Sequence, residues 1–130
     1  MKKKYEYIRI IDVYLLSMLF KEVIGQESVK ERLRNMYIER RIPHAMLFLG
    51  PEGSGVLPLA IAFATYINCT GDKSHGDACG VCPSCVKMSK LVHPDLHFSF
   101  PIVLKSSSSV SSDYLAERRE MIIRQPYFNY

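Results

Sequence analysis

All four cysteines of the chain lie within one short segment, in the pattern Cys-x9-Cys-x2-Cys-x2-Cys. They are Cys69, Cys79, Cys82 and Cys85. Two-residue separations let thiolates converge on one metal ion with tetrahedral geometry. Four thiolates leave no coordination position for a reactive water, so the pattern predicts a structural Zn²⁺ site. Structural zinc contributes ~10 kcal/mol or more to folding, so its removal is expected to unfold at least residues 69–92.

Other interpretations of the cysteines stay open. An iron–sulfur cluster also takes four thiolates, although Cys69 stands on the wrong side of the group for the common bacterial arrangement. Free thiols are a second alternative. His75 and His93 are substitute ligands in principle, but with four cysteines present each is expected to be a surface or turn residue. In a reducing cytosol, such closely spaced cysteines favour metal binding over disulfides.

A second group of residues has the spacing of a phosphate-binding loop between an apolar run and an apolar helix pattern. Glycines let such a loop turn its N–H groups inward, and the helix N-terminus adds partial positive charge. The candidate cofactor-binding residues are Gly50, Pro51, Gly53, Ser54 and Gly55. An ordinary strand-to-helix turn is the alternative interpretation.

The two residues after this loop are Val56 and Leu57. In a working loop the first position is a lysine that contacts the phosphates, and the second is a Ser or Thr that holds magnesium. Loss of one charge-assisted contact costs about 1.5–3 kcal/mol of binding, and catalysis loses more. The sequence therefore predicts weak or absent ATP binding, no hydrolysis and no catalytic residues, while the backbone amides keep some capacity for phosphate or sulfate.

Helices and two strands are expected to position these sites. Apolar residues at helical spacing predict a helix over 26–40 with one buried stripe. The apolar run 45–49 predicts a strand buried on both faces, which makes the expected fold class α/β, with a parallel sheet flanked by helices and a small inserted zinc module. The other expected elements are a helix over 56–68, a helix over 83–91, a strand over 95–100, a serine-rich loop over 105–112 and a helix over 113–125.

The composition is that of one globular domain, with 130 residues of which 48% are hydrophobic and 23% charged. Three lysines at positions 2–4 account for most of the net charge of +4, so no basic field for nucleic acid covers the body of the protein. Residues 1–20 imitate a secretion signal, but Arg9 and Asp12 interrupt them, and the remaining run is shorter than the ~20 residues of a membrane span. We therefore expect a cytoplasmic protein without a membrane segment.

Four sequence features are specific in combination and together indicate a family. They are the segment Phe20-Lys21-Glu22-Val23-Ile24-Gly25-Gln26, the segment from Arg41 to Pro51, the four-cysteine insertion after the loop helix, and His93-Pro94-Asp95. Over most of residues 18–100 they make the chain similar to the bacterial DNA polymerase III clamp-loader subunits. The resemblance implies an AAA+ fold and a rigid, nucleotide-independent member of a pentameric ring that loads the sliding clamp during DNA replication. It also implies contacts with the ATPase and delta-like subunits, and with DNA only through the complex.

Within this family the ATPase subunit keeps the Lys and the Ser or Thr, while the delta-prime subunit often does not. Val56 and Leu57 therefore favour a delta-prime-like, accessory subunit with no enzymatic activity of its own. The family's Ser-Arg-Cys motif and acidic magnesium-binding strand are absent from these 130 residues, which we expect to be the front of a longer protein. The expected organisation is an N-terminal extension over 1–17, a candidate mis-start, followed by a partial P-loop domain over 18–130 with the zinc module at 69–92.

Two other functions stay open. An active clamp-loader ATPase of the gamma/tau type would need another lysine, such as Lys87 or Lys90, to serve the phosphates, and geometry disfavours this. A zinc-knuckle nucleic-acid-binding module would use these two lysines and Lys73, which flank the cysteines. Three lysines are more often a solvated face, and only a steep salt dependence of DNA binding would favour that module.

Overall fold

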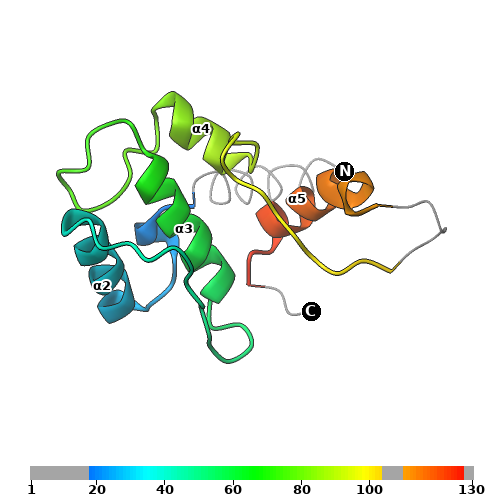
Figure 1. The fold of residues 1–130 in the computed structure, drawn as a ribbon, viewed down its shortest axis with the longest axis horizontal. Coiled ribbons are helices and arrows are strands. Elements are labelled where there is room, and N and C mark those ends of the chain that lie inside the picture. The colour runs from blue at the N-terminus through cyan, green and yellow to red at the C-terminus, as the bar shows by residue number, and fades with distance from the viewer. Residues whose placement is uncertain (1–17, 104–109, 128–130) are drawn as a thin grey trace, which may run out of the picture.

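The computed structural model describes residues 18–103 and 110–127, and within them the chain is helical. The elements are η1 (Phe20–Glu22), α2 (Glu27–Ile38), α3 (Val56–Asn68), α4 (Pro83–Ser89), η2 (Ser111–Tyr114) and α5 (Leu115–Arg124). Helix α3 is central and contacts η1, α2 and α4 (Figure 1). The expected extension 1–17 and most of the serine-rich loop lie outside the described residues.

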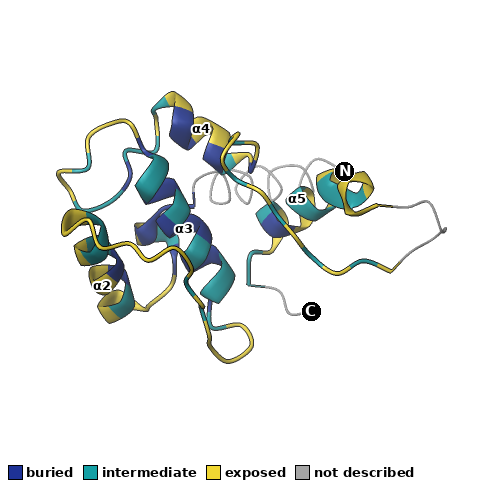
Figure 2. Cartoon of the chain, in the orientation of Figure 1, coloured by how far each residue is buried: buried dark blue, intermediate teal, exposed yellow. Residues whose placement is uncertain are grey.

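Helix α3 begins and ends where its sequence predicted. Gly55 precedes it in a left-handed conformation (φ 82°), which a glycine adopts without steric cost. Pro58 is tolerated because it lies in the first turn, where its missing N–H has no helical partner to lose. The helix is buried around much of its circumference, as Figure 2 shows, and its apolar surface joins two hydrophobic clusters.

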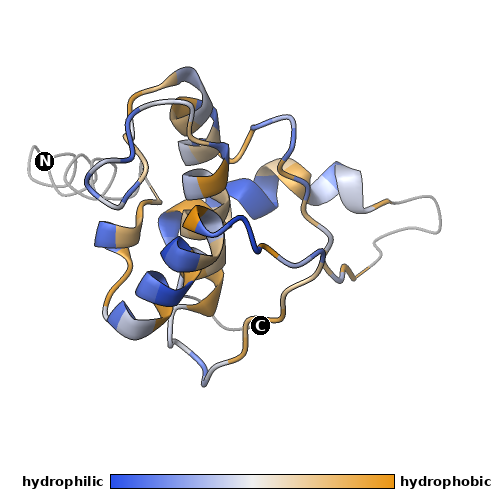
Figure 3. Ribbon diagram, turned by 60° about the vertical axis from the view of Figure 1, so that its left-hand side comes forward, coloured by the Kyte–Doolittle hydropathy of each residue, from blue (hydrophilic) through white to orange (hydrophobic). Residues whose placement is uncertain are grey.

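The larger cluster lies between η1, α2 and α3. Phe20 is fully buried there, with its ring centroid 6.4 Å from that of Phe63 and 5.4 Å from that of Tyr66. Helix α2 contributes the predicted apolar stripe, so that prediction is confirmed. The stripe consists of Val29, Leu33, Met36 and Tyr37. Polar residues cover the outer side of α2, which separates the core face from solvent (Figure 3).

The smaller cluster joins α5 to the opposite side of α3. Its buried members are Met18, Ile61, Leu91 and Ile122. Because Ile61 belongs to α3 and Ile122 to α5, this cluster holds the last helix against the central one. None of the helices within residues 18–103 and 110–127 combines the length and hydrophobicity needed to cross a lipid bilayer.

The predicted α/β fold class with a parallel sheet is wrong for the described residues, none of which forms a strand. In the segment 45–49, Leu47 and Leu49 are each 81% exposed, so this run is not buried on two faces. The segment 95–100 contacts the smaller cluster, whereas 45–49 contacts the larger one. Strands of a sheet pair only when their backbones lie side by side. Neither of the two segments is paired as a strand with another described residue.

Lys30 is a charged residue of α2 that lies in the interior of the protein. Its side chain is only 2% exposed, and its Nζ donates hydrogen bonds to the Val23 carbonyl (2.7 Å) and to Glu27 Oε1 (2.6 Å). A buried ammonium is tolerated only when such partners replace water. Lys30 thereby joins the start of α2 to the end of η1.

The position of Phe20 leads to a prediction. We expect Phe20→Ala to lower the free energy of unfolding by ~3–5 kcal/mol, because a fully buried ring is replaced by a cavity. The control Ile24→Ala removes a side chain that is 77% exposed and should change stability by less than ~0.5 kcal/mol. Urea unfolding followed by circular dichroism measures both values. Equal stabilities of the two variants would contradict the assignment of Phe20 to the core.

Candidate metal centre

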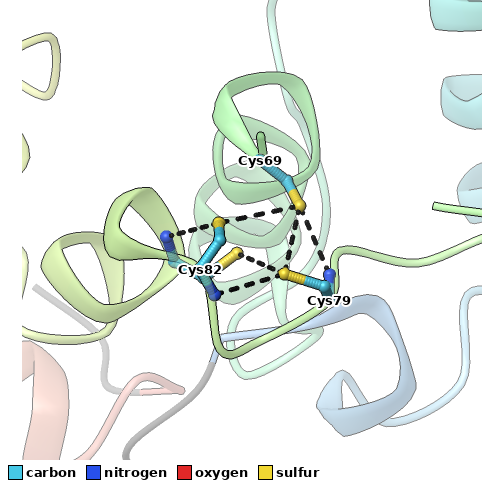
Figure 4. Close-up of side chains that lie close together, drawn as sticks. Cys69, Cys79 and Cys82 are labelled. Atoms are coloured by element: carbon cyan, nitrogen blue, oxygen red, sulfur yellow. Dashed lines mark hydrogen bonds between the residues drawn. The ribbon is translucent and has the colours of Figure 1, made fainter. Parts of the chain in front are cut away.

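The four cysteines lie together at the junction of α3 and α4. All four Sγ atoms lie within 4.8 Å of one another. The Sγ of Cys69 is 3.6 Å from that of Cys79 and 4.0 Å from that of Cys82, and the Sγ atoms of Cys79 and Cys85 are 4.0 Å apart (Figure 4). Four sulfurs around one Zn²⁺, at ~2.3 Å each, are separated by about 3.8 Å in a tetrahedron. The thiols therefore have the spacing of four ligands on a single ion.

Each cysteine is positioned by a local feature of the backbone. Cys69 is the first residue after α3, and Cys79 follows on the loop that leaves it. Cys82 is the N-cap of α4, and its Sγ accepts the N–H of Cys85 at 3.4 Å. Pro83 occupies the first helical position, where its fixed φ favours a helix start. The cap of α4 is therefore itself a member of the candidate metal site.

Backbone donors point at the sulfur atoms and favour their charged form. The Cys79 N–H donates to the Sγ of Cys69, and the Cys82 N–H donates to the Sγ of Cys79, both at 3.3 Å. Donors of this kind stabilise a thiolate and so increase its availability as a metal ligand.

The pKa values of the thiols reflect these surroundings. Burial acts to raise the pKa of Cys82, but hydrogen bonds from Thr70 and from the Cys85 N–H outweigh it and lower the pKa to about 5. The N–H groups of Val81 and Cys82 lower the pKa of Cys79. Burial raises the pKa of Cys85, so this thiol depends most on a nearby positive charge to lose its proton.

Gly71 is required for the close approach of the loop to the cysteines. A Cβ built at this position would lie 2.5 Å from the Sγ of Cys79 and 3.1 Å from its Cβ. Contacts this short do not occur between real atoms, so any larger residue would displace Cys79. The sequence suits Gly71 to a tight turn of the predicted zinc module, and the structure adds the steric reason, because the loop passes directly beside the Cys79 side chain.

The two histidines near the cysteines lie outside the group of four thiols. His93 Nε2 lies 3.0 Å from Ser84 Oγ, and His93 Nδ1 accepts the N–H of Asp95 at 3.2 Å. Because Nδ1 accepts, the proton of a neutral ring sits on Nε2 and is donated to Ser84. The contact between His93 and Ser84 joins the segment after α4 to that helix.

The glycine-rich loop lies at the other end of α3. Gly53 and Gly55 have positive φ values of 71° and 82°, and Ser54 N–H donates to the Pro51 carbonyl at 3.1 Å. Gly50 is needed because a Cβ there would collide with the Oγ of Ser54. About 20 Å of helix, at ~1.5 Å per residue, separate this loop from Cys69. The two candidate sites are therefore independent in space.

A pocket of about 290 Å³ borders the loop, and its walls include Val56, Leu57 and Tyr127. Of the described residues that line it, none is a lysine or arginine, and Glu52 carries a negative charge. The ring of Tyr127 is so near Gly55 that an added Cβ would meet it at 2.8 Å. The Tyr127 hydroxyl accepts the N–H of Ile24 at 2.9 Å, which fixes the ring in front of the loop.

The lysines that flank the cysteines have different environments. Lys73 Nζ lies 4.2 Å from the ring centroid of Tyr37 and donates to its hydroxyl at 2.6 Å. Lys87 and Lys90 are exposed on or just after α4. Lys73 is therefore held against α2 and α3 by aromatic contacts, whereas the other two lysines face solvent.

The contact of Gly71 with Cys79 leads to a prediction about metal binding. We expect Gly71→Ala to weaken zinc binding by about 10-fold or more, because the new methyl displaces a ligand sulfur. Gly53→Ala is the control, since a Cβ there meets no atom within 4 Å and strains only the distant loop. Competition with a chromophoric chelator measures both affinities. Unchanged affinity in Gly71→Ala would show that the cysteines hold the metal in another arrangement.

Proteins similar to this chain include bacterial DNA polymerase III subunits and plant STICHEL-like proteins. The DNA polymerase III subunit gamma/tau of Mycobacterium tuberculosis is 35% identical over 108 residues, which cover 82% of this chain and 18% of that protein. The DNA polymerase III subunit tau of Bacillus subtilis is 35% identical over 66 residues, or 51% of this chain and 12% of that protein. Protein STICHEL-like 2 of Arabidopsis thaliana is 36% identical over 66 residues, or 51% of this chain and 8% of that protein.

The chain thus matches between 8% and 18% of the length of these relatives. No solved structure matches it at a significant level. A family model described as "DNA polymerase III, delta subunit" matches residues 25–129. Because this match covers well over half of the sequence, the chain belongs to the DNA polymerase III delta subunit family.

Proposed function

We propose that this chain is a non-catalytic, delta-prime-like subunit of the DNA polymerase III clamp loader. In this role it is a rigid ring member beside the ATPase and delta-like subunits and acts in DNA replication without nucleotide turnover of its own. Family membership and the gamma/tau and tau relatives support a clamp-loader subunit. The absence of catalysis is proposed from one observation, namely the residues that form the wall of the pocket beside the glycine-rich loop.

Among the described residues, that wall lacks the groups that a bound triphosphate requires. Val56 and Leu57 present methyl groups where an ammonium and a hydroxyl would be needed. Charge-assisted contacts of this kind contribute ~1.5–3 kcal/mol each, so their loss removes most of the affinity for Mg-ATP. Tyr127 further narrows the space in front of Gly55. The loop therefore serves as a structural turn at the start of α3.

We also propose Zn²⁺ as the metal of the cysteine site, held by Cys69, Cys79, Cys82 and Cys85. Sulfur separations of 3.6–4.0 Å favour a single ion over an iron–sulfur cluster, whose cysteines are spread around several metal atoms. Such an ion supplies a cross-link and no reactive water, because all four of its positions are filled by sulfur. The residues it joins make up the module 69–92 between α3 and the segment after α4.

An ATPase subunit of the gamma/tau type remains the second candidate function, because several relatives carry that name. It would require a cation from outside the described lining of the pocket, since neither Lys87 nor Lys90 lines it. Both candidates include a cytoplasmic location, where the cysteines stay reduced and able to bind metal.

A titration with Mg-ATP tests the proposal. We expect no saturable binding by the full chain at millimolar ATP in isothermal calorimetry. The variant Val56→Lys with Leu57→Thr should gain about 10-fold or more in affinity, because it restores the two missing contacts. Val103→Lys is the matched control, since it adds the same charge at a position that is 89% exposed and far from the loop in sequence. Micromolar binding by the unmodified chain would overturn the non-catalytic assignment in favour of the gamma/tau type.

A further inference from the structure

The loop between the first two cysteines docks onto elements that lie far from it in sequence. It leaves α3 at Cys69, returns to the metal site at Cys79, and contacts both η1 and α2 on the way. In the sequence, this stretch is only part of the predicted zinc module over 69–92. The structure instead shows three specific anchors, at Lys73, Gly76 and Asp77.

Asp77 provides the anchor to η1. Its Oδ1 accepts the Phe20 N–H at 3.1 Å, and its Oδ2 accepts the Lys21 N–H at 2.9 Å. Oδ1 also accepts the N–H of Ala78 at 2.8 Å, which fixes the carboxylate relative to its own backbone. A short helical turn leaves its first N–H groups without internal partners, so an anionic side chain placed there stabilises it.

The backbone donors of residues 19–23 are then all satisfied. Leu19 N–H donates to Glu22, while the N–H groups of Glu22 and Val23 donate to carbonyls within the turn. The remaining two, those of Phe20 and Lys21, depend on Asp77. Because Phe20 is fully buried in the main core, the orientation of this turn decides whether its ring enters that core.

The other two anchors hold the same loop against α2. Arg34 Nε donates to the Gly76 carbonyl at 2.5 Å, and the guanidinium lies 5.1 Å from the ring centroid of Phe20. Lys73 Nζ lies over the rings of Tyr37 and Tyr66. The loop between Cys69 and Cys79 therefore contacts both the turn that carries Phe20 and the helix α2 that packs against it.

We infer that Asp77 is a positioning residue that couples metal binding at the cysteines to the docking of the N-terminal segment 18–23. The inference rests on the proposed metal centre. When Cys69 and Cys79 share an ion, the loop between them has its two ends joined, and this lowers the entropy cost of holding Asp77 against η1. Coupling is reciprocal, so the docked segment must in turn strengthen metal binding.

The test uses the full 130-residue chain with Co²⁺ as a spectroscopic probe and Zn²⁺ for affinity. In the unmodified chain, we expect zinc to slow amide hydrogen exchange at Phe20 and Lys21 by about 10-fold or more relative to the chelated protein. In Asp77→Ala, the cobalt–thiolate absorption should persist, the exchange at these two amides should no longer respond to metal, and zinc should bind about 10-fold more weakly. Asp77→Asn keeps one acceptor oxygen, so its zinc affinity and its metal-dependent amide exchange should lie between those of the unmodified chain and those of Asp77→Ala.

Asp72→Ala is the matched control. Asp72 lies in the same loop, but the hydrogen bonds of its carboxylate are local to that loop, from the N–H and hydroxyl of Ser74 and from the backbone of Lys73. We expect this variant to keep both the zinc affinity and the metal-dependent exchange of the unmodified chain, so an equal loss in both variants would overturn the role of Asp77.

The possible outcomes distinguish failure of the proposed metal centre from failure of the coupling through Asp77. Absence of cobalt–thiolate absorption in the unmodified chain would overturn the metal centre itself. Normal cobalt absorption with metal-independent exchange at Phe20 and Lys21 would overturn the coupling alone. If Asp77→Ala fails to fold, the comparison of zinc-loaded and chelated unmodified protein still decides the coupling.

Discussion

The convergence of four thiols at the end of α3 is the constraint on which the other features of this protein depend. Helix α4 has seven residues, too few to be stable by itself in water. It is held because Cys82 caps its start and because Cys85 and Met88 are buried. The loop that precedes it has no regular structure, yet it packs against α2 and η1 through side chains. A cross-link at the cysteines would stabilise both segments at once.

The two ends of α3 differ in the groups that they offer to a ligand. At the N-terminal end, Gly50 and Gly55 are still required by close contacts with Ser54 and Tyr127, although the groups that would bind a triphosphate are absent from the described lining of the pocket. At the C-terminal end, all four candidate ligands are present and close together. The proposed role as a rigid subunit agrees with this difference, since a filled four-thiolate centre contributes stability and no reaction.

Much of the local structure could be predicted from the sequence. The helix over 56–68, the buried stripe of the helix near 26–40 and the proximity of the four cysteines all follow from spacing along the chain. The sheet could not be predicted correctly, because the apolar run at 45–49 has the composition of a buried strand but no partner beside it within the described residues. The residue composition of a segment indicates only its tendency to form a strand. Pairing also requires that the fold place the backbone of a second segment beside it.

By itself, the sequence determined which residues are capable of binding metal and that apolar residues follow the glycine-rich loop, because both depend on residue type and short spacing. Only the tertiary structure decided that Asp77 caps a turn 57 residues earlier, that Tyr127 bonds to Ile24 across 103 residues, and that Lys30 is buried. These contacts join residues that are far apart along the chain, and no helical or strand periodicity in the sequence predicts which of them meet. They form because burial of the core brings polar groups together, and each such group must then find a partner to replace water.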